Sequence, residues 1–361
     1  ADTESIISIA NQGMCQMPIL RYQQIDGRNT VLPIGTRKIN TFRTLITESL
    51  AGFVPFKIQE IQEPGGIYFG ENYVSHNLIL CNTENLLNQA MIILGIPGSG
   101  KSFFAKLYIL ILALSRKDDI IICDPEGEYT PLVKALKGEV IHISAGGKDH
   151  INAMDMVEGY GDNPIADKSQ FIMSLIEQID KNGVGAHQKS IIDRCVDAVY
   201  RDCTENGTTP TLKTLRRKLL EQPEKKAKDL ALALELFTSG SLDIFAHETN
   251  VDTSNRILSY DIHELGSQLK PAGLLTITDA MLNRVTSNWK RGKRTHVFID
   301  EFHVLLRDPQ TAAYSRDIWK RFRKWGGIPT GITQNVKDLL ASKEVENIFE
   351  NSDFVYLLNQ A

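Results

Sequence analysis

The fold of this chain is indicated most clearly by the stretch Gly95-Ile-Pro-Gly-Ser-Gly-Lys101-Ser102. It has the form G-x-x-x-x-G-K-S, the phosphate-binding loop of nucleotide hydrolases. Apolar runs lie before it at residues 91–94 and after it at residues 103–114, the strand–loop–helix context that such a loop needs. The glycines let backbone N–H groups turn toward phosphates, and the following helix adds its positive amino end. The stretch therefore predicts a nucleoside triphosphate site.

The loop assigns candidate roles to its side chains. Lys101 would reach the β- and γ-phosphates, and Ser102 would bind Mg²⁺. The residues expected to bind the nucleotide are Gly95, Pro97, Gly98, Ser99, Gly100, Lys101, Ser102 and Phe103. The nearest stretch to a guanine-reading motif, Asn335-Val-Lys-Asp338, has the wrong order. We therefore expect ATP/ADP and Mg²⁺ as ligands.

Composition bounds the class of protein. The 361 residues are 42% hydrophobic and 23% charged, enough for a large core and about two domains. A formal net charge of -4 gives no global sign of nucleic-acid binding, although DNA remains a candidate partner. The five cysteines form no C-x-x-C pair, which favours a reduced cytosolic protein. The longest apolar run, residues 107–114, is too short to span a bilayer, and no signal peptide is visible.

Short apolar runs recur along the chain, and most are continuous rather than alternating, as in strands buried on both faces of a parallel sheet. They lie at residues 77–80, 91–94, 120–123, 140–143, 257–260, 297–299, 330–332 and 354–358. Helical patterns separate several of them, at residues 102–115, 131–137, 274–291 and 308–325. This alternation predicts an α/β layer fold with right-handed crossovers.

The connection between the runs at 140–143 and 257–260 is too long for a single crossover helix. It contains helical patterns at residues 166–180, 187–200, 211–219 and 225–237. We therefore expect residues 157–255 to form an all-α subdomain inserted into an ATPase domain made of residues 61–156 and 256–361. Residues 1–60 are expected to be the end of a preceding domain and a linker. Because the chain begins without Met and stops just after an apolar run, we expect it to be part of a longer protein.

Polar groups follow four of the predicted strands, and ligands bind outside the carboxyl ends of strands in open parallel sheets. Asp300-Glu301 has the form of a Walker B element, in which Asp300 would hold Mg²⁺ and Glu301 would act as general base. Gln334 would sense the γ-phosphate or orient water, or simply make a hydrogen bond at a strand end. Asp124-Pro-Glu-Gly-Glu-Tyr129 follows a fourth strand. These groups should meet at one edge of the sheet.

Three further features have two readings each. The helical pattern at 308–325 carries Arg316, Lys320 and Arg323 opposite its apolar stripe. Arg323 would either serve as an arginine finger in the site of a neighbouring subunit or belong to a solvated basic face. His303 suggests a metal ligand, but a packing role is the favoured reading. The clusters at 216–218 and 225–228 indicate a solvated helix face or a partner surface.

The motifs together resemble conjugative-transfer ATPases of the VirB-four type, also called the TrbE/CagE class, which belong with the HerA/FtsK-like hexameric motors. The resemblance runs from about residue 31 to residue 361. Besides the loop and Walker B, it rests on Asp124-Pro-Glu-Gly-Glu-Tyr129, Asn152, Lys320-Arg-Phe-Arg-Lys-Trp-Gly-Gly327 and Gly331-Ile-Thr-Gln-Asn335.

The resemblance implies a RecA-like P-loop NTPase with a mostly parallel sheet, flanking helices and an inserted all-α subdomain. It implies ATP hydrolysis that energises pilus assembly and the transfer of DNA or protein through a type IV secretion system. It also implies self-association, as a hexamer or, in isolation, a dimer or monomer. The partners would be inner-membrane and other ATPase components, at the cytoplasmic face of the bacterial inner membrane. Two alternatives share the core: a DNA translocase of the coupling-protein or FtsK kind, and a nucleotide-gated scaffold.

Overall fold

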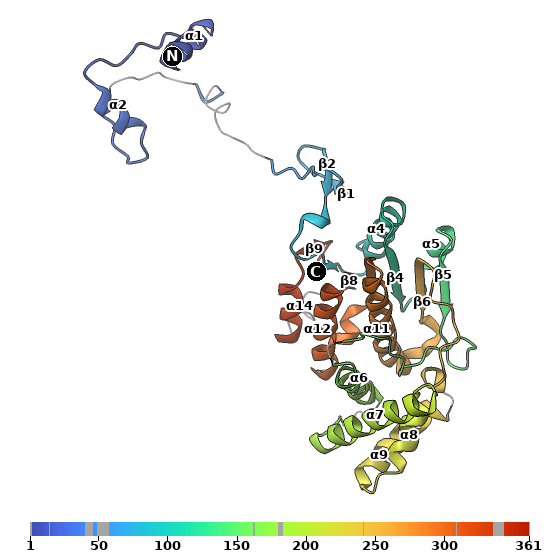
Figure 1. Cartoon of the computed structure of the whole chain (residues 1–361). Helices are drawn as coiled ribbons and strands as arrows, with labels where there is room; N and C mark the ends of the chain where they lie inside the picture. The colour runs from blue at the N-terminus through green and yellow to red at the C-terminus, as the bar shows by residue number, and fades with distance from the viewer. Residues whose placement is uncertain are drawn as a thin grey trace. The chain divides into compact units, whose positions relative to one another are not determined.

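The computed structural model describes residues 2–13, 15–39, 46–48, 58–161, 163–179, 183–240, 242–307, 309–334 and 343–360. The chain divides into two compact units, Ala1–Gln59 and Glu60–Ala361. In the first, two helices are described, α1 (Asp2–Gln12) and α2 (Gln24–Val31) (Figure 1). The assignment of residues 1–60 to a preceding domain stays a prediction.

In the described part of the second unit, seven strands form one parallel sheet in the order β5-β6-β4-β7-β8-β3-β9. The strands are β3 (Met91–Leu94), β4 (Asp119–Asp124), β5 (Glu139–His142), β6 (Ile257–Asp261), β7 (Thr295–Ile299), β8 (Gly327–Thr333) and β9 (Phe354–Leu357). Every residue of β3, β4, β7 and β8 is buried, as continuous apolar runs require. The predicted α/β fold with a mostly parallel sheet is confirmed.

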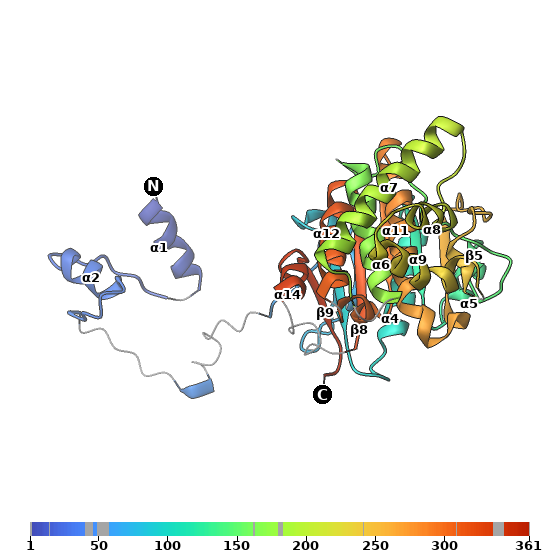
Figure 2. The same ribbon diagram turned by 90° about the horizontal axis from the view of Figure 1, so that it is seen from below.

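Helices cover both faces of this sheet (Figure 2). On one face, α4 (Lys101–Ser115) and α5 (Thr130–Ala135) pack on residues such as Ile93 and Ile122. On the other face, α11 (Gly266–Lys290) and α12 (Pro309–Lys324) pack on the strand residues that point the opposite way, such as Ile92 and Ile121. Strand side chains point to opposite faces in turn, so each strand supplies both cores.

One predicted strand belongs elsewhere. The run at 77–80 was expected to join the parallel strands, but it forms β2 (Leu78–Cys81), which pairs antiparallel with β1 (Ile67–Glu71) in a separate hairpin. Its side chains are only partly buried, unlike those of a central strand. The hairpin packs beside the sheet instead, through Phe69 against Tyr108 and Phe354. A short apolar run does not by itself distinguish these two environments.

Between β5 and β6 the chain forms α6 (Pro164–Ile179), α7 (Ala186–Asn206), α8 (Leu212–Leu220), α9 (Lys225–Ala233) and α10 (Glu235–Thr238). The pattern predicted as one helix at 225–237 is broken at Leu234. Two residues expected at helix ends, Asp180 and Asp308, lie outside the described residues. These helices share one continuous core with α11 and α12, so the core does not mark them off as a unit of their own. The separate helical subdomain at 157–255 therefore stays a prediction.

A buried charge cluster fastens α6 to the two core helices. The Lys168 side chain is completely buried, and its ammonium lies 2.5 Å from the Asp279 carboxylate of α11. Asp279 also accepts hydrogen bonds from the hydroxyls of Tyr160 and Tyr314, the latter at 2.8 Å. The Lys168 ammonium further donates to the Ala153 carbonyl at 3.2 Å. These hydrogen bonds offset the cost of removing the two charges of the buried pair from water.

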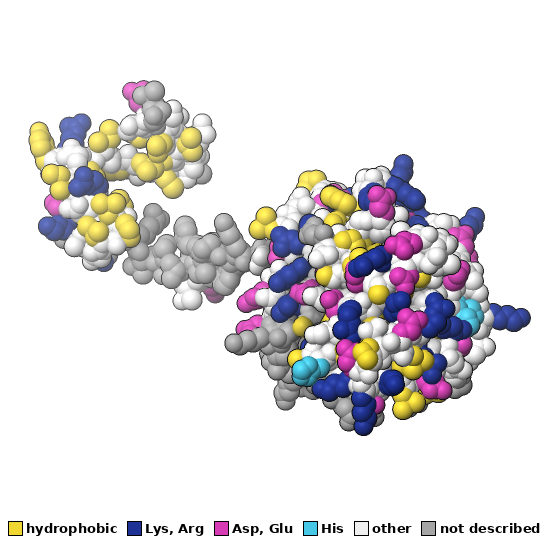
Figure 3. Space-filling view, turned by 60° about the horizontal axis from the view of Figure 1, so that its bottom comes forward, with side chains coloured by type: hydrophobic (Ala, Val, Ile, Leu, Met, Phe, Trp, Pro, Cys, Tyr) yellow, Lys and Arg dark blue, Asp and Glu magenta, His cyan; other side chains and the backbone are white. Residues whose placement is uncertain are grey.

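Two side chains of the basic cluster at 216–218 form ion pairs. Arg216 contacts Glu235 at 2.9 Å, and Lys218 contacts Asp202 at 2.7 Å and Glu221 at 3.2 Å. The face in Figure 3 likewise mixes Lys and Arg with Asp and Glu side chains rather than gathering them into one basic patch. These contacts favour the reading of a solvated helix face.

Candidate active site

The phosphate loop joins β3 to α4, and its backbone depends on glycine. Gly98 and Gly100 have φ of 78° and 94°, in the left-handed region that side chains with a Cβ disfavour. A Cβ on Gly95 would collide with Ser99 and would lie 2.8 Å from Leu358. Gly100 is also the N-cap of α4 and offers no side-chain oxygen to the helix. The amino end of α4 is therefore left with N–H groups directed at the loop.

Two side chains of the loop fit an anionic ligand. The Lys101 ammonium donates to the loop's own carbonyls, at 2.7 Å to Gly95 and 3.4 Å to Ile96, so it lies over the loop. The Ser99 hydroxyl is buried and has no hydrogen-bond partner among the described residues. An orphaned donor beside a cation and a helix amino end fits a phosphate group. Phe103, on the first turn of α4, exposes 75% of its surface.

Asp300 lies directly after β7, at the same edge of the sheet as the loop. Only 6% of the residue is exposed. One carboxylate oxygen accepts the Glu301 backbone N–H at 2.8 Å, and the other accepts the Tyr129 hydroxyl at 3.1 Å. Burial raises the pKa of Asp300 to about 6. A nearby cation would favour its charged form.

Both carboxylate oxygens of Glu301 have a polar neighbour. Gln334, which follows β8, donates its side-chain amide to Oε1 at 2.7 Å, and Nδ1 of His303 lies 3.1 Å from Oε2. Glu301 itself has φ of 49°, an uncommon conformation for a residue with a side chain. Gln334 and Glu301 therefore meet, as expected of neighbouring strand ends. Sequence reasoning favoured packing for His303 and missed its contact with Glu301, for which a spacing of two residues gives only a weak signal.

The comparisons with known proteins bear directly on this site. Residues 78–270 match the family described as the central domain of the helicase HerA. The chain belongs to this HerA family. The HerA match covers the phosphate loop and the turn at 124–129 but ends before Asp300, Glu301 and Gln334.

Solved structures extend the HerA comparison over most of the chain. VirB4 of Thermoanaerobacter pseudethanolicus matches with a TM-score of 0.73 and 26% identity, covering 84% of this chain and 87% of that one. The plasmid coupling protein TrwB, in complex with the non-hydrolysable ATP analogue ADPNP, matches with a TM-score of 0.53 and 14% identity, covering 89% and 80%. No curated protein sequence matches the chain. The resemblance to VirB4-type ATPases is confirmed, and the TrwB match supports the shared fold.

The residues of this HerA-family site also fit Mg²⁺ bound together with a nucleotide. Asp300 and Ser102 supply a carboxylate and a hydroxyl, the hard oxygen ligands that Mg²⁺ takes. The described residues hold no group of three or more His, Cys, Asp or Glu placed to bind a metal alone.

Arg323 lies at the opposite edge of the sheet from the phosphate loop, where α12 leads into the start of β8. It is exposed and lines a cavity of about 220 Å³ together with Trp289 and Arg294. The structure therefore does not bring Arg323 to the loop of its own chain. An arginine finger at this position requires a second subunit. Asn335, the neighbour of Gln334 in the motif, lies outside the described residues.

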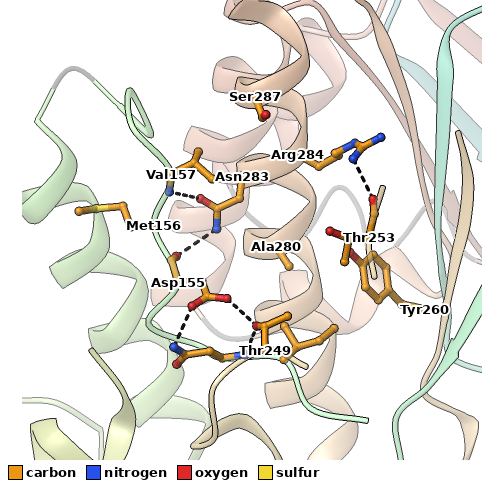
Figure 4. A pocket seen from close by; sticks show the side chains of 12 residues that line it. Asp155, Met156, Val157, Thr249, Thr253, Tyr260, Ala280, Asn283, Arg284 and Ser287 are labelled. Carbon is orange, nitrogen blue, oxygen red and sulfur yellow. Dashed lines mark hydrogen bonds between the residues drawn. The ribbon is translucent and has the colours of Figure 1, made fainter. Parts of the chain in front are cut away.

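Asn152, another residue of the resemblance, borders a second cavity, of about 290 Å³. Figure 4 shows this cavity with Asp155 and Thr249, which also line it. Its side-chain amide donates at 2.8 Å both to Asp155 and to the Pro210 carbonyl. Thr249 donates to the same Asp155 at 2.5 Å. These bonds tie the segment that leads into helices α6–α10 to the one that leads out. The Asn152 side chain therefore stabilises this junction.

Proposed function

We propose that this chain binds Mg²⁺ and ATP at the carboxyl edge of its sheet and hydrolyses ATP to energise a type IV secretion or conjugation apparatus. One observation carries the proposal: the loop after β3, Gln334 after β8 and Asp300-Glu301 after β7 lie on three neighbouring strands. The HerA family and the likeness to VirB4 support the same conclusion.

Each residue has a proposed part in hydrolysis. Lys101 would exchange its loop carbonyls for the β- and γ-phosphates. Ser102 and Asp300 would hold Mg²⁺, which when bound neutralises charge developing on the phosphates. Glu301 would accept a proton from the attacking water. Gln334, through its 2.7 Å hydrogen bond, would keep the Glu301 carboxylate aimed at that water and respond to the γ-phosphate.

The setting of this activity is also a proposal. We place the chain in a self-associating motor, a hexamer when assembled, which acts with inner-membrane and other ATPase components at the cytoplasmic face of the inner membrane. Of the helices in the described part of the chain, none has the length and apolar character of a membrane span. Sedimentation with and without ATP, followed by pull-down of membrane partners, tests this setting. A particle that stays monomeric and captures no secretion component would contradict it.

A DNA-translocating motor is the second candidate, and the TrwB likeness in fold favours it. A translocase should bind DNA with an affinity that falls steeply with salt, because phosphate contacts release counterions. DNA should also stimulate its ATPase. A secretion ATPase that does not move DNA should show neither effect.

Arg323→Ala is expected to leave ATP binding intact and to lower hydrolysis by roughly 10³-fold, the lower range for an arginine finger. The reason is that Arg323 would act on a neighbour's ATP. Lys320→Ala, on another exposed position of α12, serves as the matched control and should keep full turnover. In oligomers mixed with Lys101→Ala protein, some activity should return at interfaces that combine an intact site with an intact arginine. No recovery at any mixing ratio would count against action in trans.

A further inference from the structure

The turn between β4 and α5, Asp124-Pro-Glu-Gly-Glu-Tyr129, follows a strand of the parallel sheet at its carboxyl end. Its first residue fixes its shape. The buried Asp124 carboxylate accepts the backbone N–H of Glu128 at 3.0 Å and that of Tyr129 at 2.8 Å. Gly127, with φ of 71°, lets the chain reverse between them. The side chains of Glu128 and Tyr129 are therefore presented from a rigid turn.

Tyr129 reaches the residue proposed to hold Mg²⁺ from β7. The ring is fully buried, and its hydroxyl donates to Asp300 Oδ2 at 3.1 Å. A phenol is protonated at neutral pH, so the Tyr129 hydroxyl is the donor in this hydrogen bond. The backbone N–H of Glu301 donates to the other oxygen, Oδ1, so both oxygens of the Asp300 carboxylate accept a hydrogen bond that orients them.

Glu128 reaches the other proposed ligand of the metal. Its carboxylate lies beside the Ser102 hydroxyl, and the Lys106 ammonium, one helical turn further along α4, is 3.3 Å from it. A hydroxyl that binds a cation through an oxygen lone pair must direct its hydrogen elsewhere. The Glu128 carboxylate is an acceptor for that hydrogen.

We propose that this turn is a positioning device for the metal site: Tyr129 orients the Asp300 carboxylate and Glu128 orients the Ser102 hydroxyl. The inference rests on the proposed function, since it assumes that Asp300 and Ser102 hold Mg²⁺. Two adjacent residues of one turn thus set the ligands that come from two different strands. Partners of this kind orient metal ligands and typically change metal affinity by 10- to 100-fold.

The test measures Mn²⁺ binding, as a spectroscopic substitute for Mg²⁺, by electron paramagnetic resonance on the full chain with ADP. Tyr129→Phe and Glu128→Ala should each weaken Mn²⁺ binding by about tenfold and leave metal-free ADP binding unchanged. Glu128→Gln, which keeps an acceptor oxygen, should retain most of the affinity. The matched control is Glu126→Ala in the same turn, whose carboxylate contacts Lys270 at 2.5 Å and neither metal ligand. It should bind Mn²⁺ like the wild type.

A second background separates positioning from a general effect on folding. If Glu128 acts through Ser102, Glu128→Ala should cause no further loss of Mn²⁺ affinity in a Ser102→Ala chain, and thermal unfolding should be unchanged. Wild-type Mn²⁺ affinity in both Tyr129→Phe and Glu128→Ala would overturn the positioning inference and leave the proposed function standing. An equal loss of Mn²⁺ affinity in Glu126→Ala would do the same. If the wild type itself bound no Mn²⁺ with ADP, the proposed nucleotide site would fall with it.

Discussion

Replacing Glu301 by glutamine is expected to lower ATP turnover by roughly 10²- to 10⁴-fold, the usual contribution of a general base. Glutamine keeps the size of the side chain and can still meet the Gln334 amide, but it cannot take a proton from water. ATP affinity should stay within about twofold of wild type, because Glu301 lies beside the phosphate loop without being part of it. Steady-state phosphate release and equilibrium binding of a fluorescent ATP analogue would measure the two quantities.

Glu264→Gln provides the matched control for this prediction. Glu264 is an exposed carboxylate that follows β6, so the change removes the same charge from the same sheet edge. Its turnover should equal that of the wild type. Turnover like the wild type in Glu301→Gln would remove Glu301 from the proposed mechanism, while equal losses in both variants would indicate a general electrostatic effect.

Lys168→Met is expected to destabilise the second unit by about 3–5 kcal/mol, the cost of leaving a buried charge without its partner. The Asp279 carboxylate would keep the Tyr160 and Tyr314 hydroxyls but would lose the ammonium now 2.5 Å away. The double variant Lys168→Met with Asp279→Asn should recover part of the loss, because the uncompensated charge is removed. Urea unfolding followed by circular dichroism measures the change in midpoint.

The control for this prediction is an ion pair on the neighbouring helix. Arg201 and Asp197 of α7 are paired in solvent, with 66% and 42% of their side chains exposed. Arg201→Met should cost less than about 1 kcal/mol. A Lys168→Met chain that unfolds at the wild-type midpoint would show that the cluster does not fasten α6 to the core.

The sheet could be predicted because its strands are buried on both faces, so runs such as residues 91–94 and 120–123 are continuous and apolar. The strand ends then located Lys101, Asp300 and Gln334 at one edge without any knowledge of strand order. The helical pattern predicted at residues 274–291 missed the first part of α11, which contains Pro271, a residue that disfavours a helix interior. The structure carries α11 through this proline from Gly266.

What the sequence could not reveal are contacts between residues far apart in the chain. The burial of Lys168 depends on Asp279, 111 positions away, and a lysine on an amphipathic helix is normally exposed. The same holds for Tyr129 and Asp300, which are 171 positions apart. The parallel sheet brings their strands together, since β4 pairs with β7, but no local pattern encodes that pairing.

If the carboxyl edge of the seven-stranded sheet hydrolyses ATP, the release of phosphate in the presence of Mg²⁺ and ATP should depend on the phosphate loop. Wild-type chain and Lys101→Ala chain, purified identically, would be compared at several protein concentrations, so that assembly-dependent activity is included. We expect sustained turnover by the wild type and none above background for Lys101→Ala. Equal rates in the two proteins, whether both at background or both active, would contradict it.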